Sequence, residues 1–173
     1  GDGGASYNLN IINSELKCRN RIYGMAGTRD ANVVIQNSRI WAIKCYFRQG
    51  SGITRFKVKD SHIFTTNYQY YAENVNGNGS TYGDFENVVL RSCTYDFWRT
   101  PEVPGYFKFK YAAIYCEGDQ VSGLQNRIDI GKYRSGGYKS DAPEDGNDGI
   151  WQGPVHVKSY NNDLDSSFTV LSS

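Results

Sequence analysis

Residues 31–38 read ANVVIQNS, and segments of the same kind return along most of the chain. Each has apolar residues at alternate positions, followed by polar residues such as Asn, Asp and Ser. The alternation predicts a strand, and a strand pattern that returns about every 20 to 30 residues is typical of a solenoid. The copies begin at Leu9, Val33, Phe56, Val88, Ile128 and Val155, with intervals of 24, 23, 32, 40 and 27 residues.

A second, aromatic strand follows several of these copies. Residues 44–47 read KCYF, residues 68–71 read YQYY and residues 106–109 read YFKF. Two or more short strands per repeat, separated by turns, predict an all-β fold, a parallel β-helix with about six to seven coils. The alternative is a β-sandwich, but its strands would return about every 8 to 12 residues without a longer repeat.

The chain is expected to form a single domain over residues 1–173, with coils from residue 8 to about 160. Residues 161–173 are expected to link to a further domain or to form a trimer contact, because Phe168 to Leu171 is still apolar. The polar residues that end the copies are expected to stack at one corner of the coil, where side-chain amides can bond from coil to coil. The competing interpretation is that these residues are only turn formers, which would occupy the same positions. They are Asn13, Asn37, Asp60, Ser92 and Ser159.

Charge and composition exclude some classes of partner. Lys and Arg number 19 against 18 for Asp and Glu, a formal charge of +1, so neither nucleic acid nor an anionic membrane is an expected partner. Without a run of about 18 apolar residues, no membrane insertion is expected. The four cysteines, Cys18, Cys45, Cys93 and Cys116, lie apart in strand-like segments. We expect unpaired thiols, which fits folding in a reducing cytoplasm.

The longer intervals indicate loops that leave the coil. With about 23 residues for a bare coil, the extra residues fall at 73–84, 117–125 and 141–149. We expect these three loops to leave on one side and to form a continuous wall, because neighbouring strands lie about 4.8 Å apart. A shorter interruption, 101–105, is expected at a different corner.

Carboxylates in this predicted wall are the candidate catalytic residues. Hydrolysis of a glycosidic bond needs an acid and a base, and Asp84 with Glu117 or Asp119 from the next coil would supply them. The competing interpretation is that these are solvated loop carboxylates. A β-eliminating lyase would instead need a base and a cation for a uronate. Its candidates are Arg55, Lys57, Lys59 and His62 on one coil, with Arg39 and Lys44 on the coil before.

Aromatic residues near the predicted wall are the candidate sugar-binding residues. A flat ring with a polar edge suits the mixed surface of a sugar. The first candidates are Tyr82 and Trp151, at the edges of the predicted wall, and the next are Tyr70 and Trp98. The competing interpretation is that such rings stack inside the coil. Asp141 is a further candidate for substrate binding. No cofactor is expected except Ca²⁺, for which the acidic segment provides Asp141, Asp145 and Asp148 without the full calcium-binding loop.

The repeated segments NVVIQNS (32–38) and FENVVLRS (85–92), with the abundant Tyr and Gly, resemble the pectate-lyase-like right-handed β-helix superfamily, most closely bacteriophage tailspikes and tail fibres. The resemblance covers residues 8 to about 160. It implies binding or cleavage of polysaccharide by hydrolysis or β-elimination, a homotrimer, and a place on the virion tail outside the cell after folding in the host cytoplasm.

The leading hypothesis is therefore a tailspike-type domain that binds and cleaves a bacterial surface polysaccharide as a glycosidase or lyase. The alternative is a non-catalytic structural or adhesive β-helix segment of a tail fibre or surface adhesin. The one-sided wall with its carboxylates favours the first, and the small number of coils favours the second.

Overall fold

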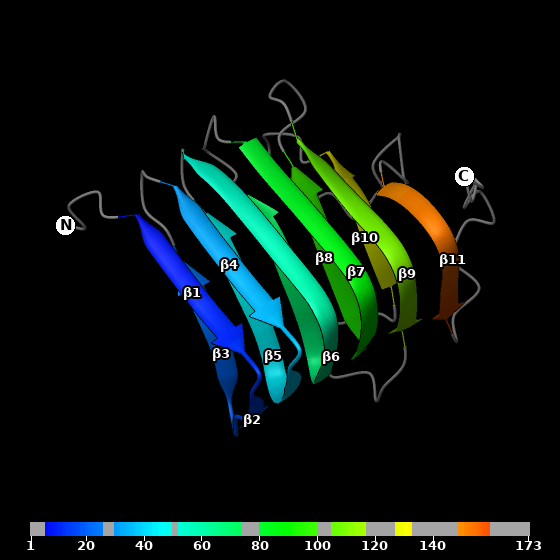
Figure 1. Ribbon diagram of the computed structural model, residues 1–173, viewed down its shortest axis with the longest axis horizontal. Coiled ribbons are helices and arrows are strands. Elements are labelled where there is room, and N and C mark those ends of the chain that lie inside the picture. The colour runs from blue at the N-terminus through cyan, green and yellow to red at the C-terminus, as the bar shows by residue number, and fades with distance from the viewer. Residues whose placement is uncertain are drawn as a thin grey trace.

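The computed structural model describes residues 6–25, 30–49, 52–73, 80–99, 105–116, 127–132 and 149–159. Within them the regular elements are all strands, stacked side by side along the long axis (Figure 1). They are β1 (Tyr7–Ile12), β2 (Glu15–Lys17), β3 (Arg21–Met25), β4 (Ala31–Gln36), β5 (Arg39–Gln49), β6 (Ile53–Glu73), β7 (Ser80–Ser92), β8 (Thr94–Arg99), β9 (Tyr106–Cys116), β10 (Arg127–Lys132) and β11 (Gly149–Ser159).

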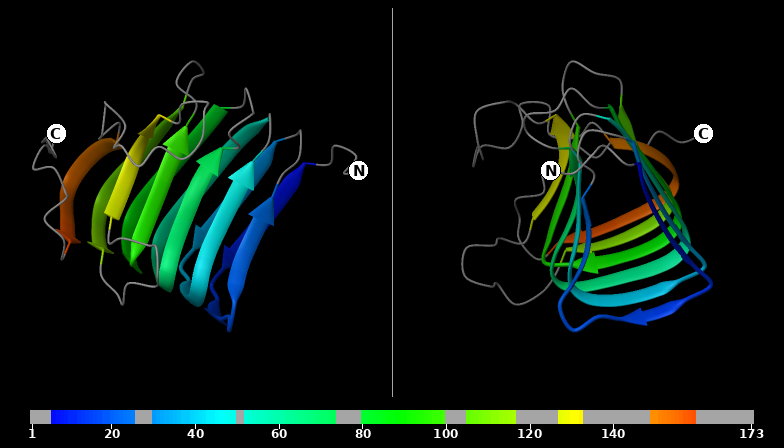
Figure 2. Two further views of the ribbon diagram at one scale, coloured as in Figure 1. Left: turned by 180° about the vertical axis from the view of Figure 1, so that it is seen from behind. Right: turned by 90° about the vertical axis from the view of Figure 1, so that its left-hand side faces the viewer.

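The strands surround an interior on three sides, as the end-on view in Figure 2 shows. The first face is a parallel stack in the order β1-β4-β6-β7-β9-β11. The second face contains β2, residues 39–42 of β5, 61–65 of β6, 88–92 of β7, 112–116 of β9 and 155–159 of β11. The third face contains β3, residues 44–49 of β5, 68–73 of β6, β8 and β10.

All these pairings are parallel, which confirms the predicted all-β solenoid and excludes the sandwich. The longest strands run across more than one face, so that β6 alone contributes to all three. In the part of the chain that the structure describes, no helix is long and apolar enough to span a membrane.

The interior is filled by the inward side chains of successive coils. Phe85 and Phe109 stack with ring centroids 5.1 Å apart, and Tyr71 meets Phe85 edge-on at 5.2 Å. Gly83 lies between Phe56 and Phe107 in the register, and the rings of these two residues are stacked at 6.5 Å. A Cβ atom on Gly83 would lie 2.4 Å from the Phe107 ring. Because Gly83 has no side chain, the rings of Phe56 and Phe107 can stack on each other across its position.

One corner of the coil is marked by a column of residues with positive φ, between the first and second faces. In this column Asn37 donates from Nδ2 to Asn13 Oδ1 at 2.9 Å, and Asn87 donates to Asp60 Oδ1 at 2.7 Å. Asn13, Asn37 and Asp60 thus share one corner as predicted, and the predicted amide bond from coil to coil is confirmed between Asn13 and Asn37. Short polar residues and Gly tolerate the left-handed conformation best. The column consists of Asn13, Asn37, Asp60, Asn87, Tyr111 and Gly153.

Ser92 was predicted for this column, and the structure corrects that. It is buried on the second face, with its Oγ 2.6 Å from Thr65 Oγ1. Ser159 pairs with Cys116 on the same face, also away from the corner.

The register of the later coils also differs from the prediction. On the first face Ile35 pairs with Val58, Val58 with Phe85, and Phe85 with Phe109. Residues 83–85, and not Val88, therefore continue this face. The segment starting at Ile128 belongs to the third face, where β10 pairs with β8. The segment starting at Val155 belongs to the second face. Apolar alternation occurs on every face, so it does not distinguish one face from another.

The connections between strands follow from this register. β6, β8 and β10 end on the third face and the strands that follow them begin on the first, whereas β9 ends on the second face and β10 begins on the third. Most of the predicted wall at 73–84, 117–125 and 141–149 lies outside the described residues, so its grouping on one side remains a prediction. Residues 101–104 of the interruption predicted at 101–105 also lie outside the described residues. Ser80 to Asp84, predicted as loop, are the first residues of β7.

None of the four cysteines, all of which lie in described segments, forms a disulfide, as predicted. Cys45, Cys93 and Cys116 are fully buried and Cys18 is partly exposed. The three buried cysteines behave as small apolar residues of the core.

Candidate functional site

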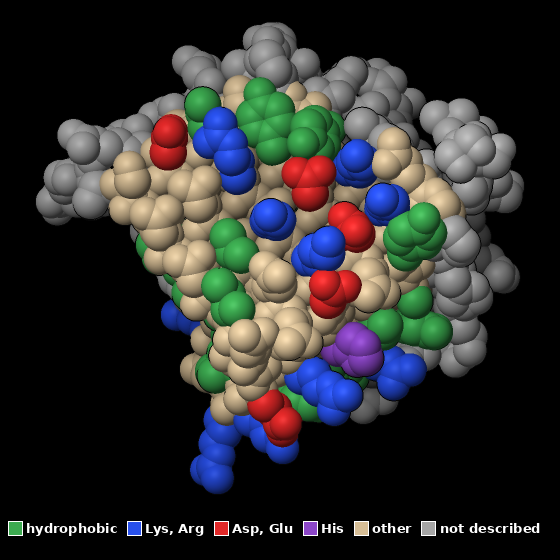
Figure 3. All heavy atoms as spheres, in the orientation of Figure 1, with side chains coloured by type: hydrophobic (Ala, Val, Ile, Leu, Met, Phe, Trp, Pro, Cys, Tyr) green, Lys and Arg blue, Asp and Glu red, His purple; other side chains and the backbone are tan. Residues whose placement is uncertain are grey.

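The outward positions of three neighbouring strands on the first face form a regular grid of nine side chains. Strand alternation directs every second residue of β6, β7 and β9 away from the core, and the parallel register places equivalent residues side by side. In Figure 3 this face shows aromatic side chains at one end and alternating blue and red charges across its middle. The three rows of the grid are Arg55–Tyr82–Tyr106, Lys57–Asp84–Lys108 and Lys59–Glu86–Lys110.

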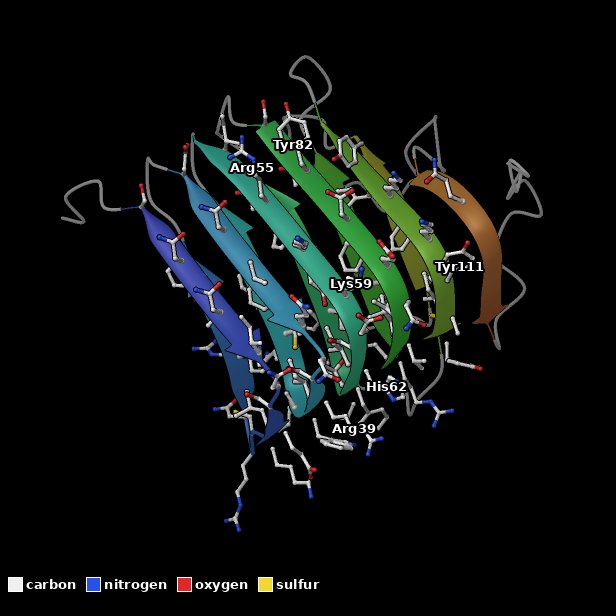
Figure 4. The ribbon with its side chains drawn as sticks, viewed as in Figure 1. Arg39, Arg55, Lys59, His62, Tyr82 and Tyr111 are labelled. Atoms are coloured by element: carbon white, nitrogen blue, oxygen red, sulfur yellow. The ribbon has the colours of Figure 1, made fainter. Side chains whose placement is uncertain are left out.

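The first row forms an aromatic cluster with polar edges. The Tyr82 and Tyr106 rings meet edge-to-face with centroids 5.3 Å apart, and the Arg55 guanidinium lies over the Tyr82 ring at 5.9 Å. Tyr106 donates its hydroxyl proton to Asp84 Oδ2 at 3.1 Å. Both rings are half-buried, so each is held by its neighbours while part of it faces solvent (Figure 4).

The Tyr106 hydroxyl is kept in its protonated form. Partial burial raises the pKa of Tyr106 above its usual value, and the nearby negative charge of Asp84 and the hydrogen bond to it raise this pKa further. Tyr106 therefore acts as a donor to Asp84. Rings with a neighbouring carboxylate and guanidinium offer an apolar surface with both acceptors and donors at its edge.

The other two rows each place a carboxylate between two lysines. Asp84 lies in register between Lys57 and Lys108, and Lys59 Nζ lies 3.4 Å from Glu86 Oε1. Opposite charges on adjacent strands support the stack, although exposed pairs contribute only about 0 to 1 kcal/mol. Within the grid five cations face two carboxylates, and the nearby corner adds Asp60. The grid is thus net positive in a chain whose formal charge is +1.

Two of the sequence-predicted site residues, Tyr82 and Asp84, come together in this grid. Tyr70 and Trp98 lie on the third face, where Tyr70 pairs with Asp96 and Trp98 with Ala72. Trp151 lies in β11 on the first face and pairs with Phe109. Only the backbone positions of Tyr70, Trp98 and Trp151 are described. Glu117, Asp119, Asp141, Asp145 and Asp148 lie outside the described residues.

In the described strands, no carboxylate lies in register with Asp84 on either adjacent coil. Its register neighbours are Lys57 and Lys108. Cys116, which directly precedes Glu117, pairs with Ser92 at the end of the second face. The acid and base pair of Asp84 with Glu117 or Asp119 remains a prediction.

The cations considered for a lyase are spread over the three faces. Lys57, Lys59 and Arg55 belong to the first face, whereas His62 lies on the second face in register with Arg39. Lys44 lies on the third face with its Nζ 5.1 Å from the Tyr68 ring centroid. In Figure 4 Arg39 and His62 lie at the opposite end of the picture from Arg55 and Tyr82. The described residues therefore do not combine these side chains in one site.

Sequence reasoning missed Tyr106, Lys108 and Lys110 as members of the site. Residues 106–109 were interpreted as a second, aromatic strand, but they are the first-face strand of their coil. Asp60 and Asn87 mark the corner directly after Lys59 and Glu86, but Tyr111 takes this place after Lys110, so the sequence offered no equivalent signal for this strand.

In the described residues, no three His, Cys, Asp or Glu side chains are grouped so that they could hold a metal ion. Comparison of the chain with protein-family models, with curated proteins and with solved structures found no match. Arguments about function therefore depend on the geometry of the grid.

Proposed function

We propose that the chain is a glycan-binding β-solenoid of the bacteriophage tailspike or tail-fibre type, and that it recognises a bacterial surface polysaccharide on its first face. The observation that carries the proposal is the cluster of Tyr82 and Tyr106 with Arg55 and Asp84. Pyranose rings present apolar C–H faces and a rim of hydroxyls, and this cluster offers the complementary combination.

The rigidity of the scaffold supports this proposal. The grid residues lie on parallel strands whose opposite side is packed with aromatic rings, so little side-chain or loop ordering has to accompany binding. The proposal includes a right-handed coil of six to seven turns, a homotrimeric assembly, and a place on the virion tail outside the cell. Six stacked segments on the first face and four free thiols are compatible with that coil and with folding in a host cytoplasm.

Binding is tested with a panel of purified capsular and O-antigen polysaccharides. Tyr82→Ala is expected to lower affinity for the bound glycan about tenfold or more, because it removes one ring and the support of the other. Tyr46→Ala, which removes a half-buried tyrosine from the third face, serves as the matched control. Equal loss in both variants, or no glycan bound by the unaltered chain, would refute the proposal.

Cleavage is a second candidate function, favoured by the half-buried carboxylate of Asp84 next to the aromatic cluster. In that case Asp84 and either Glu117 or Asp119 serve as acid and base, and replacing Asp84 by Asn lowers the rate about 10²-fold while the fold stays intact. Reducing ends and the absorbance of unsaturated uronates are followed together in the same panel. Reducing ends alone indicate a hydrolase and both signals a lyase, whereas binding without either signal supports the adhesive function.

A further inference from the structure

Tyr111 is out of place in the corner column that it occupies. Four of the other members are Asn or Asp and one is Gly, residues that accept positive φ at low cost, whereas Tyr111 has φ of 53°. A bulky aromatic residue in this region is strained. Strained residues persist where the surrounding structure holds them, and they gather at functional sites.

The Tyr111 ring is held in place and yet exposed. The next residue of the column is Gly153, where a Cβ atom would lie 2.7 Å from Tyr111 Cε1, so the glycine provides the space that the ring fills. Lys110 Nζ lies 5.2 Å from the Tyr111 ring centroid. The residue nevertheless keeps 51% of its surface exposed. This is a fixed aromatic surface and not part of the core.

Tyr111 lies on the same strand as Tyr106, at the opposite end of the grid (Figure 4). Five residues of strand place the two about 16 Å apart. The rows of Asp84 and Glu86, each between two lysines, lie between them. The surface therefore has an aromatic platform at each end and a net positive middle.

We propose that Tyr111 is a second aromatic platform for the same ligand, and that an acidic oligosaccharide lies along the strands from Tyr82 and Tyr106 to Tyr111. The lysines of the grid pair with sugar carboxylates, and Asp84 and Glu86 accept hydrogen bonds from sugar hydroxyls. This inference rests on the proposed glycan binding. It adds the direction of the bound chain, its charge and a binding residue at its far end.

The variant Tyr111→Asn separates binding from folding, because Asn is the residue that the column otherwise prefers. It is expected to raise the melting temperature by about 2 °C or more as strain is relieved. It is also expected to weaken binding of a six-residue fragment about tenfold, with less than about a twofold effect on a two-residue fragment bound at Tyr82. Tyr115→Ala, on the second face of the same strand, is the control and leaves both affinities unchanged.

The probes are two-residue and six-residue fragments of bacterial polysaccharides, uronate-containing and neutral, immobilised on one surface. Unchanged six-residue binding in Tyr111→Asn, with binding lost in Tyr82→Ala, overturns the inference and leaves the proposed function standing. A lower melting temperature in Tyr111→Asn, or a preference for neutral fragments, also overturns it. Failure of the unaltered chain to bind any fragment refutes the proposed function and the inference together.

Discussion

At the scale of single residues, the corner column explains why so many coils end in Asn or Asp. These residues combine tolerance of positive φ with side chains that bond to the coil above or below, as Asn37 does to Asn13 at 2.9 Å. Gly153 in the same corner accepts positive φ but has no side chain that could bond to another coil. The column thus contains two contributions to stability, tolerance of positive φ and a side-chain hydrogen bond between coils.

Substituting Asn37 measures both contributions. Asn37→Ala is expected to lower the free energy of unfolding by about 1 to 3 kcal/mol, because it removes the amide bond and places a Cβ-bearing residue in a strained conformation. Asn37→Gly should cost less, since Gly accepts positive φ. Denaturant titration of the two variants checks this order, and a larger loss in the glycine variant would contradict it.

The buried thiol of Cys45 makes stability fall at high pH. Burial raises the pKa of Cys45 from 9.0 to about 12 in the folded chain. The unfolded thiol loses its proton first, so the stabilising contribution is complete below about pH 9 and is lost as the pH rises toward 12.

Replacing Cys45 by Ala should therefore flatten the decline in the free energy of unfolding over this pH window. The difference in slope approaches about 1.4 kcal/mol per pH unit in the middle of the window. Denaturant titrations at a series of pH values measure it. Parallel declines for the two proteins would show that Cys45 is not the group responsible.

At the scale of elements, alternation in the sequence is enough to predict strands and the solenoid but not the face on which a strand lies. The segments at Leu9, Val33 and Phe56 are in register as predicted, because each is followed by a residue of the corner column. The prediction fails from Val88 onward, where Gly83 takes an inward position that an apolar residue fills in the coil before. A glycine gives no apolar signal, and only packing against Phe56 and Phe107 shows why it is there.

Gly83 is therefore expected to be intolerant of a side chain. Gly83→Ala should lower the free energy of unfolding by about 1 to 3 kcal/mol, the usual range for overpacking a filled core. Adding Phe107→Leu removes the ring atoms nearest the new methyl group and should recover part of the loss. A double-mutant cycle by thermal unfolding checks this coupling. Strictly additive effects would mean that the two positions do not compete for space.

The candidate site was predictable only in part for a related reason. Tyr82 and Asp84 were found because they combine an aromatic ring and a carboxylate near a long interval. Their partners Tyr106 and Lys108 come from the next coil, more than 20 residues away, and are identified only by the parallel register. Tyr111 was missed because its environment depends on φ and on the glycine of the following coil, neither of which a single segment shows.

At the scale of the whole molecule, the stack leaves apolar side chains at one end. Ile12 and Leu16, on β1 and β2, are 47% and 36% exposed. Exposed strand edges and apolar coil surfaces are usually covered by a cap or a partner. Association of identical chains is one way to cover them.

We therefore expect a homotrimer in solution. Sedimentation equilibrium at micromolar concentration should give three times the chain mass of 19.5 kDa. Ile12→Asp and Leu16→Asp should weaken the association if this end forms the contact. A monomer of 19.5 kDa for the unaltered chain would contradict the trimer.

The central claim is that the first face of the solenoid is the glycan-binding surface, and lysine footprinting tests it most directly. Acetylation rates are measured by mass spectrometry with and without saturating bound polysaccharide from the panel. The account predicts slower modification of Lys57, Lys59, Lys108 and Lys110, with no change at Lys17 and Lys44 on the second and third faces. Protection of Lys17 or Lys44 with unchanged rates in the grid would contradict it.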